Sequence, residues 1–450
     1  MKNKNSSVKI LLAIASLIIT FFVWQQGLKE SLNRPSVSFD ISQKEIEITE
    51  LAMPAVPENL KIFFPNTVKE EMNNSLSKTS FSELTERNKL IWLILQNPEK
   101  QIDQSYFNNF DDPTYINISK ILYKSYLVES YKPSKEIIND LRNDNYLFKL
   151  LSEKFNFNKD EIITSRLAKV MFLKLIIIRL IPIISILFGS FLVIKSLWRI
   201  INLKVINWAN YEPLNLNVLD MVLLVSGGFV VLGEVISPLI SITLVDLFSK
   251  NLSYEISQSL RIFIGYLFMA IPPLYIIYRQ IKFIDKKFSL KKDYFQFRIK
   301  PIKESIYQGF KGWIMVIPFV LLTSLIMNLI VENQAGSNPL LEIVLNNNNY
   351  FAFILLFLTT TLIAPLFEEI IFRGALLPVL TRDYGKIAGI LISSFVFALA
   401  HLSLNEFPPL FVLGIGLAIT RLISGRLSSS FFMHSFWNGI TFLNLFLLRT

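Results

Sequence analysis

Long apolar stretches alternate with short polar connections along most of the chain. A helix needs about 20 mainly apolar residues to cross the hydrocarbon core of a bilayer, which is about 30 Å thick. Stretches of this kind occupy residues 9–27, 174–198, 217–239, 257–279, 307–331, 349–380, 385–403, 407–424 and 428–448. The pattern therefore predicts an all-α, multi-pass membrane protein with about nine transmembrane helices.

The segment 28–165, which follows the first apolar stretch, has a different pattern. Apolar residues recur at positions i, i+3 and i+4 over Glu83–Leu95, Ile116–Glu129 and Lys135–Phe155. This spacing predicts short amphipathic helices, and Asp112-Pro113 is typical of a helix start. We expect a small helical domain here, which either docks a substrate or partner or serves only as a spacer.

Charged residues are unevenly distributed along the chain. Residues 28–165 hold 17 basic and 21 acidic residues, a net charge of −4, and the rest holds 28 basic and 14 acidic residues, a net charge of +14. The basic residues gather in alternate connections, most densely from Arg279 to Lys303. Because such loops are usually cytoplasmic, we predict a cytoplasmic N-terminus and an extracytoplasmic domain at 28–165. Topology therefore explains the positive charge, and no nucleic-acid partner is expected.

Composition narrows the available chemistry. The 450 residues are 52% hydrophobic and 18% charged, whereas a soluble domain carries about 25% charged residues. The absence of cysteine excludes disulfides, thiolate metal sites and cysteine nucleophiles. Any chemistry that needs imidazole depends on the two histidines, His401 and His434.

These patterns divide the chain into four regions. They are an N-terminal membrane anchor (1–27), an extracytoplasmic helical domain (28–165), helices two to four with a basic cytoplasmic loop (166–305) and a C-terminal helical core (306–450). The bias toward Asn, Lys and Ile is typical of an AT-rich genome, so we expect a prokaryotic plasma membrane or an internal membrane.

The C-terminal core carries ionisable side chains within its apolar stretches. Such groups are costly in a bilayer and by default indicate a functional site. Glu369 and Arg373 are four residues apart in acid-first order, so they can pair on one helix face. Glu368 lies about 100° around the helix from Glu369. It is therefore the carboxylate free to face a cavity and to act as a general base or acid.

Two further pairs have the same four-residue spacing, Phe397 with His401 and His434 with Asn438. Each pair shares a helix face, and the Phe397 ring can wall the site. Counted from the nearest basic residues, Glu368 and His401 lie about 21 and 22 Å from the inner surface, but His434 lies only about 12 Å from it. The last helix must therefore tilt for His434 to reach the others.

Pro365 stands three residues before Glu368. Proline removes a backbone hydrogen bond, so we expect a kink in this helix beside the carboxylate. The preceding residues Thr359, Thr360 and Thr361 can help to satisfy the freed carbonyls. Such a kink could make room for a water molecule.

Three motifs on successive C-terminal stretches closely resemble the signatures of the CPBP intramembrane proteases. This family includes the CAAX-type prenyl-protein endopeptidases and the bacteriocin-processing and immunity proteins, also called the Abi family. The motifs are Glu368-Glu369-x-x-x-Arg373, Phe397-x-x-x-His401 and His434-x-x-x-Asn438. The resemblance covers roughly residues 310–450, so nothing carries over to the N-terminal anchor or to 28–165.

The resemblance implies an intramembrane endopeptidase that cleaves membrane-associated or peptide substrates with an activated water molecule. By position, it implies that Glu368 and His401 activate the water, that His434 and Asn438 stabilise the oxyanion, and that Glu369 and Arg373 support the site. Membrane lipid and a peptide or membrane-protein substrate are the expected partners. A requirement for a prenyl group and the oligomeric state are left open.

The family has also been described as metal-dependent. Glu368, His401 and His434 would make a three-ligand site for a divalent metal such as zinc, with an open position for water. The chain has no HExxH helix, so it is no ordinary zincin. The sequence does not choose between metal-activated and glutamate-activated water.

Two other functions compete with a protease. A non-catalytic membrane scaffold or immunity protein of the same fold would keep the motifs' architecture without turnover. A transporter could use Glu368, Arg179 and Glu234 in ion coupling, but the sequence shows no inverted repeat.

Overall fold

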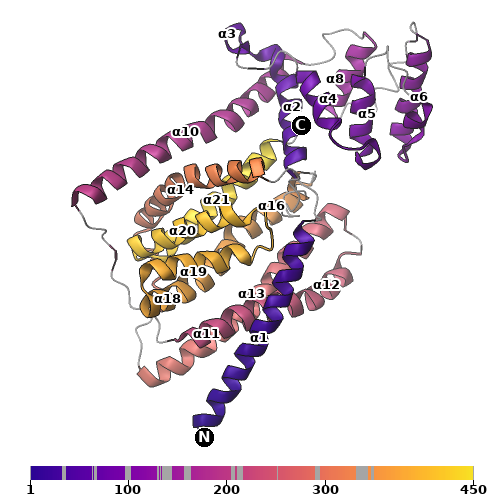
Figure 1. Cartoon of the computed structure of the whole chain (residues 1–450). Helices are drawn as coiled ribbons and strands as arrows, with labels where there is room; N and C mark the ends of the chain where they lie inside the picture. The colour runs from indigo at the N-terminus through magenta and orange to yellow at the C-terminus, as the bar shows by residue number, and fades with distance from the viewer. Residues whose placement is uncertain are drawn as a thin grey trace. The chain divides into compact units, whose positions relative to one another are not determined.

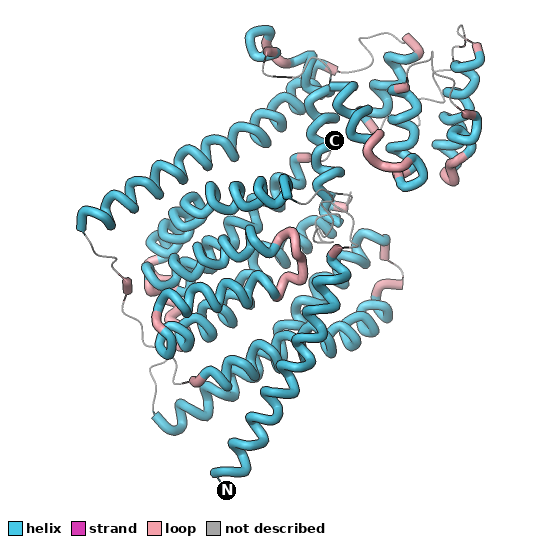
Figure 2. The backbone as a smooth tube through the Cα atoms, viewed as in Figure 1, coloured by secondary structure: helices cyan, strands magenta, loops and turns pink. Residues whose placement is uncertain are grey.

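The structure is a computed structural model. It describes residues 2–32, 37–62, 64, 68–96, 103–128, 131, 133, 144–156, 164–203, 208–209, 216–250, 252–288, 294–330, 343–345 and 349–448. Within these ranges every regular element is a helix (Figure 2), which confirms the all-α prediction. The chain forms two compact units, one from Met1–Val37 with Pro182–Phe446 and one from Ser38–Ile181 with Leu447–Thr450.

Helices of very different length build the larger unit (Figure 1). They are α1 (Lys2–Ser31), α10 (Ser165–Leu203, which begins in the smaller unit), α11 (Val218–Val222), α12 (Ser237–Phe248), α13 (Tyr254–Phe288), α14 (Ile302–Ile330), α16 (Tyr350–Leu358), α17 (Ala364–Glu369), α18 (Leu377–Tyr384), α19 (Lys386–Leu399), α20 (Phe407–Ser424) and α21 (Leu427–Leu447). Three π-helical segments, η4 (Leu223–Ile236), η5 (Thr359–Ile363) and η6 (Ile370–Leu376), interrupt them. Two of these three segments flank α17, which carries Glu368 and Glu369.

Seven helices of the described residues are long and apolar enough to cross a membrane. They are Ser7–Ser31, Ser165–Leu203, Val218–Phe248, Tyr254–Phe283, Ile302–Ile330, Tyr350–Tyr384 and Phe407–Ser424. These helices are those of a multi-pass membrane protein.

The predicted count of nine spans is therefore not confirmed. The expected span at 385–403 is α19, whose 14 residues are too short for a bilayer core of about 30 Å. The expected span at 428–448 is α21, whose serines, His434 and Asn438 make it more polar than the seven. The basic residues Lys204, Lys291 and Lys292, which the predicted topology uses, lie outside the described residues.

The helices of the larger unit pack in two groups. α20 packs against both α14 and α19, and α13 packs against η4, α12 and α16. One buried apolar cluster joins these groups, with Phe229, Trp313 and Phe397 among its members. At Gly309 on α14, an added Cβ would lie 2.8 Å from the Ser429 carbonyl of α21, so glycine permits this close helix approach.

The N-terminal helix α1 is an integral part of the larger unit. It packs along η4, where Thr20 donates a hydrogen bond of 3.3 Å to the Ser226 carbonyl. Near its start, Lys9 forms an ion pair with Asp220 of α11. A helix that served only as a detached anchor would make neither contact.

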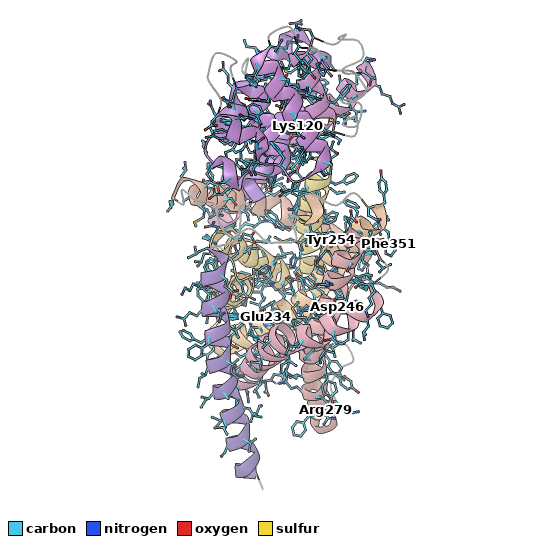
Figure 3. The ribbon with its side chains drawn as sticks, turned by 90° about the vertical axis from the view of Figure 1, so that its right-hand side faces the viewer. Lys120, Glu234, Asp246, Tyr254, Arg279 and Phe351 are labelled. Carbon is cyan, nitrogen blue, oxygen red and sulfur yellow. The ribbon has the colours of Figure 1, made fainter. Side chains whose placement is uncertain are left out.

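Glu234 lies on η4, away from the three C-terminal motifs. Figure 3 shows Tyr254 and Arg279 toward opposite ends of α13, with Glu234 at a depth between them. Its side chain is largely buried, and Oε2 has no hydrogen-bond partner. The transporter alternative would use this carboxyl group together with Glu368 and Arg179.

Short helices build the smaller unit, as the pattern at 28–165 predicts. They are α2 (Val37–Ala52), η1 (Met53–Ala55), α3 (Glu58–Lys61), α4 (Val68–Leu76), η2 (Phe81–Glu83), α5 (Glu86–Leu95), η3 (Gln104–Asn108), α6 (Pro113–Leu127) and α8 (Asn145–Lys154). Asp112 caps α6 by accepting a hydrogen bond from the Thr114 N–H, as expected for Asp-Pro at a helix start. The beginning of the helix predicted at Lys135–Phe155, residues 135–143, lies outside the described residues.

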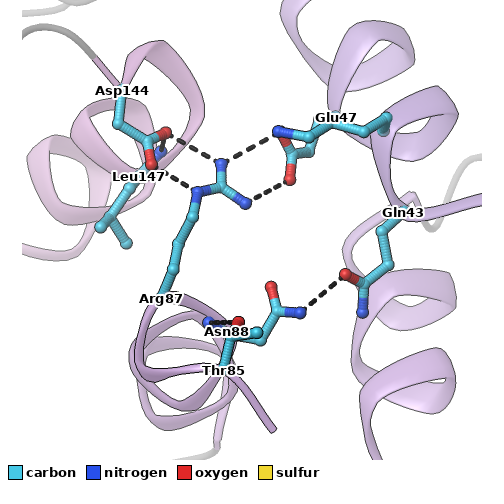
Figure 4. Close-up of polar contacts among 8 residues, drawn as sticks. Gln43, Glu47, Thr85, Arg87, Asn88, Asp144 and Leu147 are labelled. Carbon is cyan, nitrogen blue, oxygen red and sulfur yellow. Dashed lines mark hydrogen bonds and ion pairs between the residues drawn. The ribbon is translucent and has the colours of Figure 1, made fainter. Parts of the chain in front are cut away.

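Arg87 connects three helices of the smaller unit (Figure 4). Its guanidinium donates to Glu47 of α2 at 2.6 and 3.0 Å and to Asp144, the cap of α8, at 2.5 and 2.9 Å. Burial alone would raise the pKa of the Asp144 carboxyl, but the hydrogen bonds and charge of Arg87 outweigh burial and lower it. This network of charged hydrogen bonds links α5 to α2 and to the start of α8.

Lys154 predicts a pH dependence of stability. It donates to the Tyr126 hydroxyl at 3.1 Å and to the Ile94 carbonyl at 3.3 Å, and burial lowers its pKa to about 8. An unfolded lysine has a pKa of about 10.4, so between these values the unfolded chain binds the extra proton and stability rises with pH. We expect Lys154→Met to abolish this rise in denaturant unfolding of the full-length protein, followed by the fluorescence of Trp92 after the other five tryptophans have been replaced by Phe.

Lys120 provides the matched control, because its side chain is exposed on the same unit. Lys120→Met should keep the wild-type rise of stability with pH. An unchanged rise in Lys154→Met would show that Lys154 keeps its proton in the folded domain.

Candidate active site

A cavity of about 280 Å³ lies between α13, α14, α17, α20 and α21. Its polar lining includes the four residues that the sequence predicts as catalytic, Glu368, His401, His434 and Asn438. Small-molecule sites usually measure about 300–1,000 Å³, so this cavity lies just below the lower end of that range. The structure thus brings together side chains from three separate motifs.

A buried cluster of charges lies beside this cavity. Arg373 Nη1 is 3.1 Å from Glu369 Oε1, which is the pairing that the four-residue spacing predicts. The same carboxylate oxygen is 3.1 Å from His434 Nδ1. Both Glu369 and Arg373 are completely buried. Glu369 therefore holds a cation of its own helix and an imidazole of α21 at once, and the sequence analysis did not predict the second contact.

The Phe397 ring packs against the guanidinium of this charge cluster. The guanidinium carbon of Arg373 lies 4.1 Å from the ring centroid, a cation–π distance. The rings of His401 and His434 lie 4.8 and 5.7 Å from it, both edge-to-face. The Phe397 ring thus shields the buried cation, and it is not among the residues that line the cavity.

Glu368 differs from Glu369 in its surroundings. Its side chain is 12% exposed, lines the cavity and leaves Oε2 without a hydrogen-bond partner. That oxygen lies 3.8 Å from His434 Nε2, too far for a direct hydrogen bond. Because His434 Nδ1 donates to Glu369, its Nε2 is the nitrogen that faces Glu368. The geometry leaves Glu368 available to a molecule in the cavity.

His401 stands in the turn that follows α19. Its Nδ1 is 2.8 Å from the Phe397 carbonyl, one helical turn earlier. Since a carbonyl only accepts hydrogen bonds, Nδ1 carries the hydrogen, and the neutral ring keeps Nε2 as its proton acceptor. His401 is one of the residues that line the cavity.

Asn438 binds to a break in the helix before Glu368. In η5 the Ala364 N–H bonds to the Thr359 carbonyl, and Pro365 has no N–H, so the Thr360 carbonyl loses its helical partners. Asn438 Nδ2 donates to this carbonyl at 2.9 Å. The threonine hydroxyls, which the sequence suggested for this task, instead bond to carbonyls one turn earlier, such as Thr360 Oγ1 to Leu356 at 3.0 Å.

Several polar residues of the cavity lie outside the three motifs, and two of them are ionisable. Tyr266 comes from α13 and Glu406 from the start of α20. Tyr266 stands in the apolar run Gly265-Tyr266-Leu267, where no local pattern sets it apart. Only the tertiary packing of α13 could reveal its position at the cavity.

The described residues contain no group of three His, Cys, Asp or Glu side chains that could hold a metal ion. Glu368 and His434 approach each other, but His401 does not complete a three-ligand set with them. The donor geometry of the described residues therefore does not fit the metal site suggested by the sequence.

Comparison with known proteins agrees with the motifs. Residues 350–440 match the family described as type II CAAX prenyl endopeptidase Rce1-like, and residues 38–173 match a domain of unknown function, DUF8675. No curated protein and no solved structure matches the chain. The first match contains all three motifs and confirms that residues 350–440 form a domain of the CPBP and CAAX protease family.

The buried charge cluster makes a prediction about Glu369. Glu369→Gln leaves Arg373 without its carboxylate in a dry site, which typically costs about 3–5 kcal/mol. We expect a lower abundance in the membrane and a lower unfolding temperature of the purified protein.

Glu368→Gln is the matched control, because Glu368 faces the cavity and is not the ion-pair partner of Arg373. It should accumulate as wild type does. Wild-type abundance of Glu369→Gln together with lost activity would contradict this division of roles.

Proposed function

We propose that this protein is an intramembrane endopeptidase in which Glu368 and His401 activate a water molecule. The observation that carries the proposal is that four motif residues, Glu368, His401, His434 and Asn438, line one cavity. The proteolytic activity of the matched family supports it.

In the first step, the water oxygen attacks the carbonyl carbon of the scissile peptide bond. The Glu368 carboxylate, whose Oε2 has no partner in the protein, takes the water's proton. His401 Nε2 accepts the other hydrogen bond of the water and orients its lone pair toward the substrate. No side chain of the protein becomes covalently attached.

In the second step, the oxyanion of the tetrahedral intermediate needs hydrogen-bond donors. Asn438 offers the second hydrogen of its amide, because the first is held by the Thr360 carbonyl. His434 offers its Nε2 when that nitrogen is protonated. The carbon–nitrogen bond then breaks, Glu368 returns its proton to the leaving amine, and one water has been consumed.

The substrate class follows from the location of the cavity. Its walls come from apolar helices of a multi-pass membrane protein, so the substrate is a peptide or membrane protein that reaches the site from the bilayer. Charge patterning favours a cytoplasmic N-terminus and an extracytoplasmic smaller unit.

The central test replaces the two groups that activate water. Glu368→Gln and His401→Ala should each abolish cleavage, because the first cannot accept the proton and the second removes the orienting imidazole. The measurement compares new N- and C-termini in membrane proteomes of strains that express wild type or variant. Glu304→Gln, the same change on α14 away from the cavity, is the control and should cleave normally.

If both variants fully replace the wild-type protein in a strain that lacks it, the protease proposal is wrong and a non-catalytic scaffold or immunity protein is favoured.

A second test concerns a metal. Because the described residues assemble no three-ligand group, we expect cleavage by the purified protein to survive dialysis against a chelator. Elemental analysis of the active sample should show less than one metal ion per chain. Loss of activity that returns with added zinc would instead assign Glu368, His401 and His434 as ligands.

A further inference from the structure

The turn that carries His401 has an unusual backbone. Leu402, the next residue, has φ = 51°, in the left-handed region that is rarely adopted by residues with a Cβ. Such a conformation persists only where the surrounding structure enforces it, and it is frequent at functional sites. A neighbouring part of the structure must therefore hold Leu402 in this conformation.

The end of helix α1 lies against this turn. Gly27 is buried, and a Cβ at this position would lie 2.9 Å from Cδ1 of Leu402. Only a glycine lets the Leu402 side chain lie this close to the backbone of α1. The contact joins the N-terminal helix to the residue adjacent to His401.

A second contact lies one turn further along α1. Ser31 is buried and donates its hydroxyl hydrogen to the Leu28 carbonyl at 2.7 Å. Its oxygen then accepts a hydrogen bond from the Leu404 N–H at 3.4 Å. Gly27 and Ser31 are four residues apart, so one face of α1 contacts the turn at both Leu402 and Leu404.

We propose that this face of α1, formed by Gly27 and Ser31, positions His401 through Leu402. The Phe397 carbonyl fixes the ring from the side of α19, and α1 fixes the backbone from the other side. Leu402 is thus a positioning residue. Helix α1 lies outside residues 350–440, so this support belongs to this chain and not to the matched domain.

The consequence for the reaction rests on the proposed function. His401 Nε2 must stand within hydrogen-bond reach of the attacking water, and a misplacement of about 1 Å can cost on the order of 100-fold in rate. Release of Leu402 should therefore lower kcat more than it raises KM, because the binding walls of the cavity come from other helices.

The chain offers a readout that does not depend on activity. It contains two histidines, so [15N]histidine labelling of the full-length protein yields two imidazoles, which His401→Asn assigns. We expect Gly27→Val and Leu402→Ala to shift the His401 resonances and to leave those of His434 in place. Gly227→Ala is the control at a different contact of α1, the one with η4, because a Cβ there would meet Ser16 only at 3.8 Å.

The Leu402→Ala variant decides the test even if Gly27→Val fails to fold. Unchanged His401 resonances in the folded variants, or equal shifts of His401 and His434, would overturn the proposal. On substrates cleaved by wild type, we expect Leu402→Ala to lower kcat roughly 10- to 100-fold, with Gly227→Ala unaffected. Equal kcat in the two variants would overturn the positioning role, whereas absence of Glu368-dependent cleavage in wild type would refute only the proposed protease.

Discussion

The C-terminal helical core depends on the buried carboxylate of Glu369. One oxygen of this carboxylate contacts both Arg373 and His434. A guanidinium with no exposed surface is tolerable only with such a counterion and with a ring such as Phe397 over it. One buried anion thereby aligns α17, η6 and α21. Glu368, the preceding residue, lies about 100° around the helix and lines the cavity, whereas Glu369 faces the buried charges.

Much of the fold could be predicted from the sequence because the bilayer imposes a length on apolar stretches. The predicted helix at 174–198 lies within α10, and the one at 307–331 matches α14 up to Ile330, where the described residues end. The π-helical segments η5 and η6 could not be predicted, since they arise where Pro365 and close packing shift the hydrogen-bond register. The apolar stretch at 385–403 is also longer than α19, which has 14 residues (Lys386–Leu399). Apolar composition does not show where a helix ends.

In the candidate site, too, contacts within one helix could be predicted from the sequence, and contacts between distant segments could not. The pairing of Glu369 with Arg373 follows from four-residue spacing, which the backbone of one helix dictates. The contacts of Asn438 with Thr360, of His434 with Glu369 and of Leu402 with Gly27 join residues far apart in the chain. No periodicity encodes such contacts, so only packing reveals them.

The position of Glu369 also bears on how the chain is made. Ribosomal synthesis delivers Arg373 to the membrane long before α21 and its His434 exist. A charged residue at the centre of a helix costs about 2.5–3.5 kcal/mol during translocon-mediated insertion. Because Glu369 lies one turn away on the same segment, Tyr350–Tyr384 can enter the bilayer with this charge already neutralised. Glu369 thus lowers the cost of inserting Arg373 with its own helix. The His434 imidazole contacts Glu369 only after α21 has been inserted and has packed against α17.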